Sequence, residues 1–153
     1  MLSVWRICAA RYKDTAFSGI GGLYVPGRWH TQGHKIVYTA QNLSLASLEV
    51  FVHLESDRLK LVAIEAKIPE KLKIEETKIS ALPDNWQDTK QYPLLQQLGR
   101  DWLLSQRTPI LRVPSAIVPV EYNYLINPEH PDFQLQIDKP IDFKFDRRMW
   151  KQR

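Results

Sequence analysis

The stretch Gly27-Arg28-Trp29-His30, followed by Gly33 and an apolar run to Tyr38, leads into Ser-Leu-Ala-Ser-Leu-Glu-Val-Phe-Val-His-Leu at residues 44–54. This last segment decides the fold. At helical spacing its apolar side chains point in every direction, which is typical of a helix buried in the core. Asn42 or Ser44 is a suitable N-cap. We therefore expect a strand over residues 35–40, then a short buried helix around which the chain is arranged.

Glu49 lies in the middle of this apolar helix, between Leu45, Leu48 and Val52. Burying an unpaired carboxylate is costly, because even a neutral polar group loses about 2–7 kcal/mol when it gives up water without gaining a hydrogen bond. Another group of the protein, or a bound ligand, must therefore hydrogen-bond to this carboxylate or pair with its charge. One simple partner is His53, four residues later on the same helix. From the residues alone, an ion pair with His53 and a ligand-binding role both stay open.

Length and composition restrict the class of protein. The chain has 153 residues and a formal net charge of +4, which predicts a single domain over residues 1–153 with its own core. No apolar run reaches the roughly 20 residues that cross a bilayer, and we find no secretory signal. Cys8 is the only cysteine, so we expect a cytoplasmic protein without an internal disulfide or membrane contact. The four histidines lack metal-ligand spacing and no basic recognition helix is visible, so we expect neither a metal site nor direct nucleic-acid binding.

Five of the six glycines fall within residues 18–33. Glycine gathers where the backbone adopts positive φ or approaches a ligand closely. The spacing fits neither the dinucleotide fingerprint nor the Walker loop, and a tight loop without a ligand is the alternative. The same segment presents Tyr24, Arg28 and Trp29. Arginine offers a planar fork to phosphate and aromatic rings offer stacking faces, so the segment is a candidate binding loop.

Strands outnumber helices in the rest of the chain. Alternating or continuous apolar runs predict strands over residues 3–9, 35–40, 59–68, 134–137 and 141–145, with a further strand broken at Pro114. Pro93 precedes the apolar stripe of a second helix. Because strands and helices do not alternate regularly, we expect an α+β fold with a mixed or antiparallel sheet. From the strand pattern alone, Arg6 has its charged head either in solvent, which we favour, or in a polar cleft. We expect residues 70–90 to be irregular. The basic C-terminus from Arg147 is expected to be a frayed tail, with contact to an anionic partner as the alternative.

Ser115 follows the proline that interrupts its strand. No Gly-x-Ser-x-Gly elbow surrounds it, which argues against an acyl-transfer nucleophile. We expect it to have a hydrogen-bonding role, with a ligand or with the backbone.

Several short motifs occur together and in order. They are Trp5-Arg6, Gly27-Arg28-Trp29, Val37-Tyr38-Thr39-Ala40, Leu45-Ala46-Ser47-Leu48-Glu49, Arg112-Val113-Pro114-Ser115-Ala116 and Asn127-Pro128-Glu129-His130-Pro131-Asp132-Phe133. In this combination the chain resembles the RES domain, from Val4 to about Arg147. The resemblance implies a toxin of a bacterial toxin–antitoxin module, with a fold like that of the ADP-ribosyltransferase toxins. It also implies an Xre-type helix-turn-helix antitoxin as partner, NAD as substrate without a prosthetic group, and a homodimer within the complex as one option.

The resemblance also carries site residues over, position by position. It implies that the catalytic residues are Glu49, Arg28 and Tyr38. It implies that Arg6, Arg28, Tyr38 and Ser115 occupy active-site positions, where we expect them to bind NAD; the aromatic ring of Trp29 is a further candidate for NAD binding from the local sequence. His30 departs from the family, in which asparagine more often follows Gly-Arg-Trp. The resemblance gives no role to His30, His53, Asn123 or His130.

The chemistry of NAD cleavage suits these residue types. Breaking the nicotinamide–ribose bond builds positive charge on the ribose, as in glycoside hydrolysis. A fixed carboxylate sheltered from water stabilises that charge, which is the role we expect for Glu49. The arginines would bind the pyrophosphate, and Tyr38 and Trp29 would stack on nicotinamide. We therefore predict an NAD-degrading enzyme. The alternatives are transfer of ADP-ribose to a protein, and a non-catalytic binding module in which Glu49 pairs with His53 or Arg28.

Overall fold

The computed structural model describes residues 1–151. Its helices and strands are β1 (Leu2–Ala9), α1 (Gly21–Tyr24), β2 (Val37–Ala40), α2 (Leu43–Phe51), β3 (Leu61–Ile68), β4 (Ile74–Glu76), α3 (Tyr92–Ser105), β5 (Ile110–Pro114), β6 (Tyr122–Ile126), β7 (Gln136–Ile137) and β8 (Ile141–Phe143). Short 3-10 helices cover Ala10–Thr15, Ile79–Ala81, Thr89–Gln91 and Arg147–Trp150. No helix in this part of the chain is long and apolar enough to cross a membrane.

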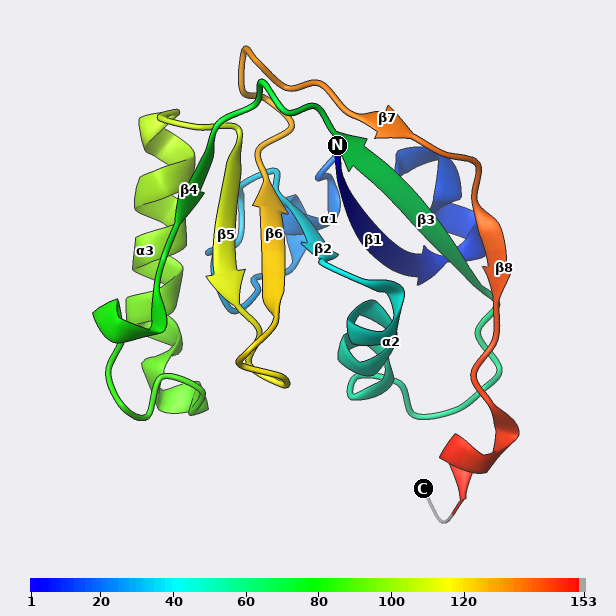
Figure 1. The fold of residues 1–153 in the computed structure, drawn as a ribbon. Helices are drawn as coiled ribbons and strands as arrows, with labels where there is room; N and C mark the ends of the chain where they lie inside the picture. Colours follow the sequence, from blue (N-terminus) through cyan, green and yellow to red (C-terminus); the bar gives the residue numbers. More distant parts are fainter. Residues whose placement is uncertain (152–153) are drawn as a thin grey trace.

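The strands form one mixed sheet (Figure 1). Their order is β4-β5-β6-β2-β1-β3-β7, and β8 also pairs with β3. β4 runs parallel to β5, whereas the other pairs are antiparallel. The predicted α+β class, with a mixed sheet and few helices, is therefore confirmed.

The sheet is joined unevenly at its middle. β1 pairs with β3 along its whole length, from Leu2 opposite Ile68 to Ala9 opposite Leu61. By contrast, within residues 1–151 β1 and β2 pair at a single position, where Trp5 lies opposite Ala40. We call this junction the seam. It divides the sheet into two half-sheets, β4-β5-β6-β2 and β1-β3 with its edge strands. In Figure 1, β5 and β6 run close to vertical, whereas β1 and β3 run obliquely.

Apolar clusters fix the two longer helices on the sheet. α3 packs on β5 through a cluster that contains Leu95, Trp102 and Leu111. α2 packs on β1 and β3 through a second cluster, in which Leu45 meets Ile7. A third cluster contains alternate residues of β1 and β3 together with the segment after the first 3-10 helix. Each half-sheet therefore has its own helix. α2 comes directly after β2 in the chain but packs on β1 and β3, on the other side of the seam.

The sequence does not predict β4 or β6. β4 has three residues, lies at the sheet edge in the segment expected to be irregular, and is surrounded by charges that hide any apolar pattern. β6 lies inside the sheet, where Leu125 and Ile126 are fully buried. Its Tyr-Asn-Tyr start and the Asn127-Pro128 turn after it are not typical of a core strand. The glycine-rich segment also holds a helical turn, α1, where only a loop was expected.

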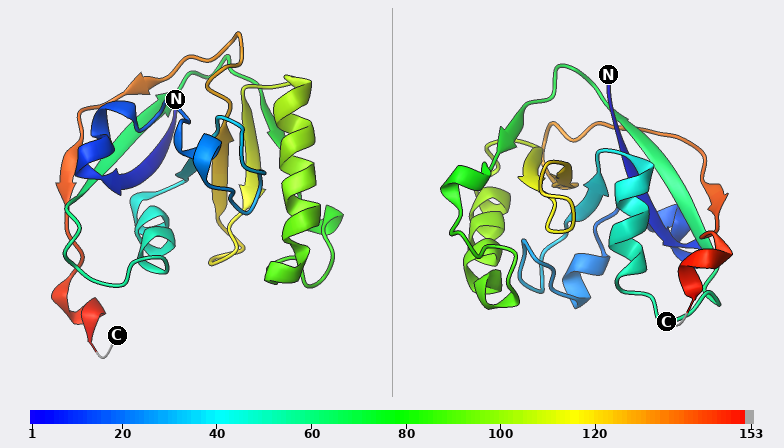
Figure 2. Two further views of the ribbon diagram at one scale, coloured as in Figure 1. Left: turned by 180° about the vertical axis from the view of Figure 1, so that it is seen from behind. Right: turned by 60° about the horizontal axis from the view of Figure 1, so that its bottom comes forward.

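The expectation of a frayed C-terminus is wrong for residues 147–150. The ring of Trp150 packs against Phe51 with centroids 5.0 Å apart and against Phe145 at 6.0 Å. Figure 2 shows this last turn beside α2. Burial of aromatic surface therefore holds a basic segment that charge alone would leave in solvent. Residues 152 and 153 lie outside the described residues.

Candidate active site

The start of α2 sets the direction in which Glu49 points. The Asn42 Oδ1 accepts a hydrogen bond from the Leu45 N–H at 2.7 Å, so the predicted N-cap is confirmed. Leu45 is buried, but Leu48 and Val52 are 38% and 56% exposed. The prediction of a helix buried on every side is therefore wrong, because α2 covers the sheet with one face and turns the other outward. Glu49 is half-buried at the boundary between these faces.

Both carboxylate oxygens of Glu49 accept hydrogen bonds from neutral donors. Asn123 Nδ2 donates to Oε1 at 2.7 Å, and the Ser115 hydroxyl donates to Oε2 at 3.2 Å. Burial raises the pKa of Glu49, and these hydrogen bonds act in the opposite direction. Among residues 1–151 no Lys, Arg or His forms an ion pair with this carboxylate, and His53 is exposed. The Glu49–His53 pair is therefore not formed, and no cation within residues 1–151 forms an ion pair with the negative charge.

Ser115 is fully buried, with 0% of its surface exposed. Its hydroxyl oxygen accepts hydrogen bonds from the Ile117 and Val118 N–H groups while its proton points to Glu49. The hydroxyl is thus fully used inside the protein. The expected hydrogen bonding with the backbone is therefore present, with the Ser115 hydroxyl as acceptor. In the structure Ser115 thus supports Glu49, and its hydroxyl has no second proton to donate to a ligand.

Tyr38 is tied to the glycine-rich segment through its hydroxyl. The Trp29 N–H donates to Tyr38 Oη at 3.1 Å, and Tyr38 Oη lies 2.8 Å from His30 Nδ1. His30 Nε2 lies 3.0 Å from the Val25 carbonyl, which can only accept, so Nε2 carries the proton and Nδ1 accepts from Tyr38. Burial lowers the pKa of His30, which favours this neutral tautomer. His30 therefore has a structural role: it fixes the loop against β2.

Trp29 is a core residue. Its side chain is 2% exposed and belongs to the cluster of Leu95 and Trp102, so it offers no open face to nicotinamide. The expectation that Trp29 stacks on the ligand is therefore wrong, because the glycine-rich segment packs its ring onto α3. Gly99 of α3 permits this approach, since a Cβ there would overlap the Trp29 carbonyl group.

Arg28, unlike its neighbour, points away from the core. Its guanidinium lies over the Tyr92 ring at 4.7 Å and donates to the Gln87 carbonyl at 3.1 Å. Arg28 is also close enough to Tyr38 to act on its phenol: burial raises the pKa of Tyr38, and the Arg28 charge partly opposes that rise. The structure thus brings Arg28 and Tyr38 together. It does not pair Arg28 with Glu49.

Arg6 lies at the seam, in the interior of the sheet. The expectation of a solvent-facing head is wrong: Arg6 is half-buried, because β1 is flanked by β2 and β3. Its Nη1 donates to the Tyr38 carbonyl at 3.1 Å, and its Nε is buried without a hydrogen-bond partner among the described residues. Burial lowers the pKa of Arg6. A buried guanidinium without a carboxylate is costly, and an anionic ligand would satisfy it.

Asn123 is the site residue that the sequence does not reveal. A single asparagine between two tyrosines on a strand gives no local signal. Only the register places it, because β6 sets Asn123 opposite Ala40 of β2, two residues before the N-cap of α2. The predicted residues thus fall into a group around Glu49 and a group around Tyr38, connected by β2.

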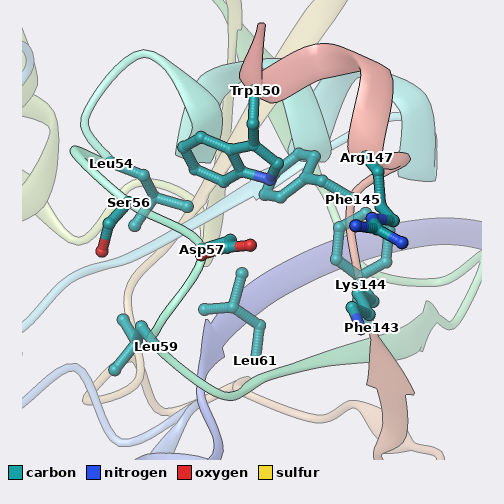
Figure 3. Close-up of a pocket in the computed structure, with 10 residues that line it drawn as sticks. All are labelled: Leu54, Ser56, Asp57, Leu59, Leu61, Phe143, Lys144, Phe145, Arg147 and Trp150. Atoms are coloured by element: carbon teal, nitrogen blue, oxygen red, sulfur yellow. The ribbon is translucent and has the colours of Figure 1, made fainter. Parts of the chain in front are cut away.

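Two cavities lie elsewhere in the fold. One of about 300 Å³ lies between the glycine-rich segment and the end of α3, where its lining includes His34, Lys35 and Glu129. A smaller one of about 30 Å³ is lined by residues that include Leu54, Arg147 and Trp150 (Figure 3). Neither is lined by Glu49, so neither coincides with the candidate site.

Comparison with known proteins gives consistent matches over almost the whole chain. The family model described as the RES domain matches residues 3–148. A protein of Photorhabdus laumondii subsp. laumondii named Toxin Res is 36% identical over 152 residues, covering 97% of each chain. A protein of Sphingobium sp. named Prs ADP-ribosylating toxin is 38% identical over 154 residues, covering 96% of each. A chain in the crystal structure of the M. tuberculosis MbcT–MbcA toxin–antitoxin complex has the same fold, with a TM-score of 0.75, 14% identity, and coverage of 93% of this chain and 84% of that one.

Proposed function

Because the chain belongs to the RES domain family, we propose that it is the toxin of a bacterial toxin–antitoxin module and acts by cleaving NAD at the nicotinamide–ribose bond. One observation carries the enzymatic part of the proposal. The Glu49 carboxylate is half-buried, held at both oxygens by neutral donors, and unpaired with any cation of the described residues. Such a charge is available to a positively charged transition state.

In the proposed reaction the bond between the nicotinamide nitrogen and ribose C1′ breaks. Its electron pair stays on the ring nitrogen, so nicotinamide leaves as a neutral molecule and needs no general acid. C1′ then carries the positive charge, which Glu49 stabilises from a fixed position. A water oxygen bonds to C1′ and loses a proton to solvent, which gives ADP-ribose.

The remaining residues of the site suit the rest of the dinucleotide. Arg28 is oriented by Tyr92 and Gln87 but makes no ion pair in the described residues, so its charge is available to the pyrophosphate. Arg6 at the seam is the second candidate for this anion. The ring of Tyr38 is fixed through its hydroxyl and is proposed to stack on nicotinamide. Trp29 and Ser115 are left out of the ligand contacts.

The test is incubation of the purified chain with NAD, with nicotinamide and ADP-ribose measured by chromatography. Glu49→Gln keeps the shape of the side chain and removes its charge. We expect its rate to fall roughly 100-fold or more, as when other groups that stabilise developing charge are removed. Glu55→Gln, on an exposed residue beyond α2, is the matched control and should leave the rate unchanged. Unchanged turnover in Glu49→Gln would remove this carboxylate from the mechanism.

A second candidate function is transfer of ADP-ribose to a protein. The name of the Sphingobium relative favours it, and the same carboxylate would serve, because only the acceptor at C1′ differs. NAD labelled in its adenosine part separates the two. Label retained on a protein after denaturing electrophoresis supports transfer, whereas label recovered as free ADP-ribose supports hydrolysis.

A non-catalytic binding module is the interpretation least consistent with the site. It requires Glu49 to be neutralised by His53 or Arg28, and neither makes an ion pair with it among the described residues. NAD that is bound but intact after hours would nevertheless favour this interpretation.

The proposal includes an antitoxin partner of the Xre class and a cytoplasmic location. The likeness to a chain solved within a toxin–antitoxin complex supports the first of these. Co-expression with the product of the neighbouring open reading frame tests it: the two proteins should purify together, and the mixture should release less nicotinamide than the isolated chain. Separate elution would contradict the partnership.

A further inference from the structure

Asn123 has no role in the family resemblance, yet the structure places it in direct contact with Glu49. We propose that Asn123 is a positioning residue, whose side-chain amide fixes the direction of the Glu49 carboxylate and favours its ionised form. What the carboxylate then does rests on the proposed function. The positioning itself rests on geometry alone.

The amide of Asn123 has only one orientation that satisfies its neighbours. Its Nδ2 donates to the Thr39 carbonyl at 3.2 Å and to Glu49 Oε1 at 2.7 Å. An amide nitrogen carries two protons, so both are used. Turning the amide by 180° would set its oxygen against two other oxygens, and neither can donate when Glu49 is ionised. The backbone of β2 therefore dictates that Asn123 presents an N–H, and not an oxygen, to Glu49.

Asn123 is better placed than Ser115 to hold the carboxylate. Its 2.7 Å contact is within the 2.7–2.9 Å range of charge-assisted N–H···O bonds, whereas the 3.2 Å contact of Ser115 is longer than such bonds usually are. Asn123 is buried on β6, between β5 and β2, opposite Val113 and Ala40. Ser115 lies at the end of β5, where a loop begins. The donor that lies inside the sheet thus makes the shorter hydrogen bond.

The charged surroundings of Glu49 make this donor more important. Glu121, directly before β6, raises the pKa of Glu49 by its negative charge and is itself held by the Asn42 side chain at 3.3 Å. Ser115 and Asn123 are the groups that lower it. Without Asn123, the carboxylate would face a second carboxylate with only one hydroxyl to support its charge.

The experiment follows the titration of Glu49 directly. Protein labelled with carbon-13 at the glutamate side-chain carboxyl is titrated by NMR, and the Glu49 signal is identified by its loss in Glu49→Gln. In Asn123→Ala we expect the midpoint to move to higher pH, since a donor to the ionised form is gone. In the same variant we expect nicotinamide release to fall roughly 10–100-fold at neutral pH, with its acid limb moved in the same direction. Asn85→Ala, at an exposed asparagine, should change neither quantity.

Two further measurements keep the result independent of folding. Asn123→Leu fills the space without a donor and should move the midpoint in the same direction. In the wild-type chain, the Asn123 side-chain amide protons should shift as Glu49 titrates, and this response should vanish in Glu49→Gln. The proposal is overturned if the Glu49 titration midpoint is unchanged in the folded variants. It is also overturned if the chemical shifts of the Asn123 amide protons do not change as Glu49 titrates.

The outcomes for the two proposals are separable. If the wild-type chain leaves NAD intact but the Glu49 midpoint depends on Asn123, the proposed reaction fails and the positioning role stands. If NAD is cleaved but the midpoint and pH profile are the same in both variants, the positioning role fails and the reaction stands.

Discussion

Gly99→Ala tests the contact that holds the glycine-rich segment against α3. A Cβ at this position would overlap the Trp29 carbonyl oxygen and lie 2.8 Å from its carbonyl carbon, whereas ordinary contacts begin near 3.4 Å. The obstacle is backbone, which cannot rotate away as a side chain could. Overpacking of this kind costs about 1–3 kcal/mol, and alanine recovers up to about 1 kcal/mol as a better helix former. Because backbone cannot yield, the cost should lie at the upper end of this range, which leaves a net loss of about 2 kcal/mol and a fall in Tm of roughly 4–8 °C for a chain of this length.

The assay is thermal and urea unfolding of the variant beside Gly21→Ala. Gly21 also lies in a helix, but a Cβ added there would meet nothing within 4 Å, so this control should not lose stability. NAD cleavage provides a second measure, because Arg28 precedes Trp29 and must move with it. We expect the KM for NAD to rise in Gly99→Ala. Wild-type stability in this variant would show that the segment does not approach α3 as described.

Three other predictions follow from the site and its support. In a pH–rate profile of nicotinamide release, the loss of activity at acid pH should be centred above the pKa of an ordinary glutamate. Burial raises the pKa of Glu49, and activity is lost as the pH falls through that raised value. A loss centred at the ordinary glutamate pKa contradicts this prediction. Ser115→Ala should lower the rate about 10-fold but add little in the Glu49→Gln background, so additive losses in the double-mutant cycle would refute the coupling. Trp150→Ala should lower the unfolding free energy by about 2 kcal/mol while Trp150→Phe keeps most of it, and equal Tm values for all three proteins would mean that the last turn is not docked.

Local patterns predicted the elements that carry their own signal. The N-cap at Asn42 and the strands around residues 3–9 and 59–68 appear near the expected places, because capping and apolar alternation act over a few residues. The helix α2 was predicted, but its exposed face was not. An apolar residue such as Val52 does not show from its identity alone whether another part of the chain covers it.

The site itself depends on contacts between distant residues. Glu49 was identified from its apolar surroundings, yet its donors come from β6 and the end of β5, and no window of sequence connects them. For the same reason the interpretation of Trp29 was wrong: an aromatic beside an arginine in a glycine-rich segment suggests a ligand, and only the packing on Gly99 shows that it belongs to the core. Arg6 was expected in solvent because the residues of one strand do not show where that strand lies in the sheet. β1 lies between β2 and β3, in the interior of the sheet.

The order of synthesis gives the Glu49 hydrogen bonds a further consequence. Ser115 and Asn123 follow Glu49 by 66 and 74 residues, so a ribosome delivers the helix well before either donor. At about 5–20 residues per second, the delay for Asn123 is roughly 4–15 seconds. During that interval the nascent chain holds a carboxylate with nothing to orient it. A growing polypeptide therefore cannot assemble this centre until Asn123, in its last third, has been translated, and a message cut short before that point yields a product without it.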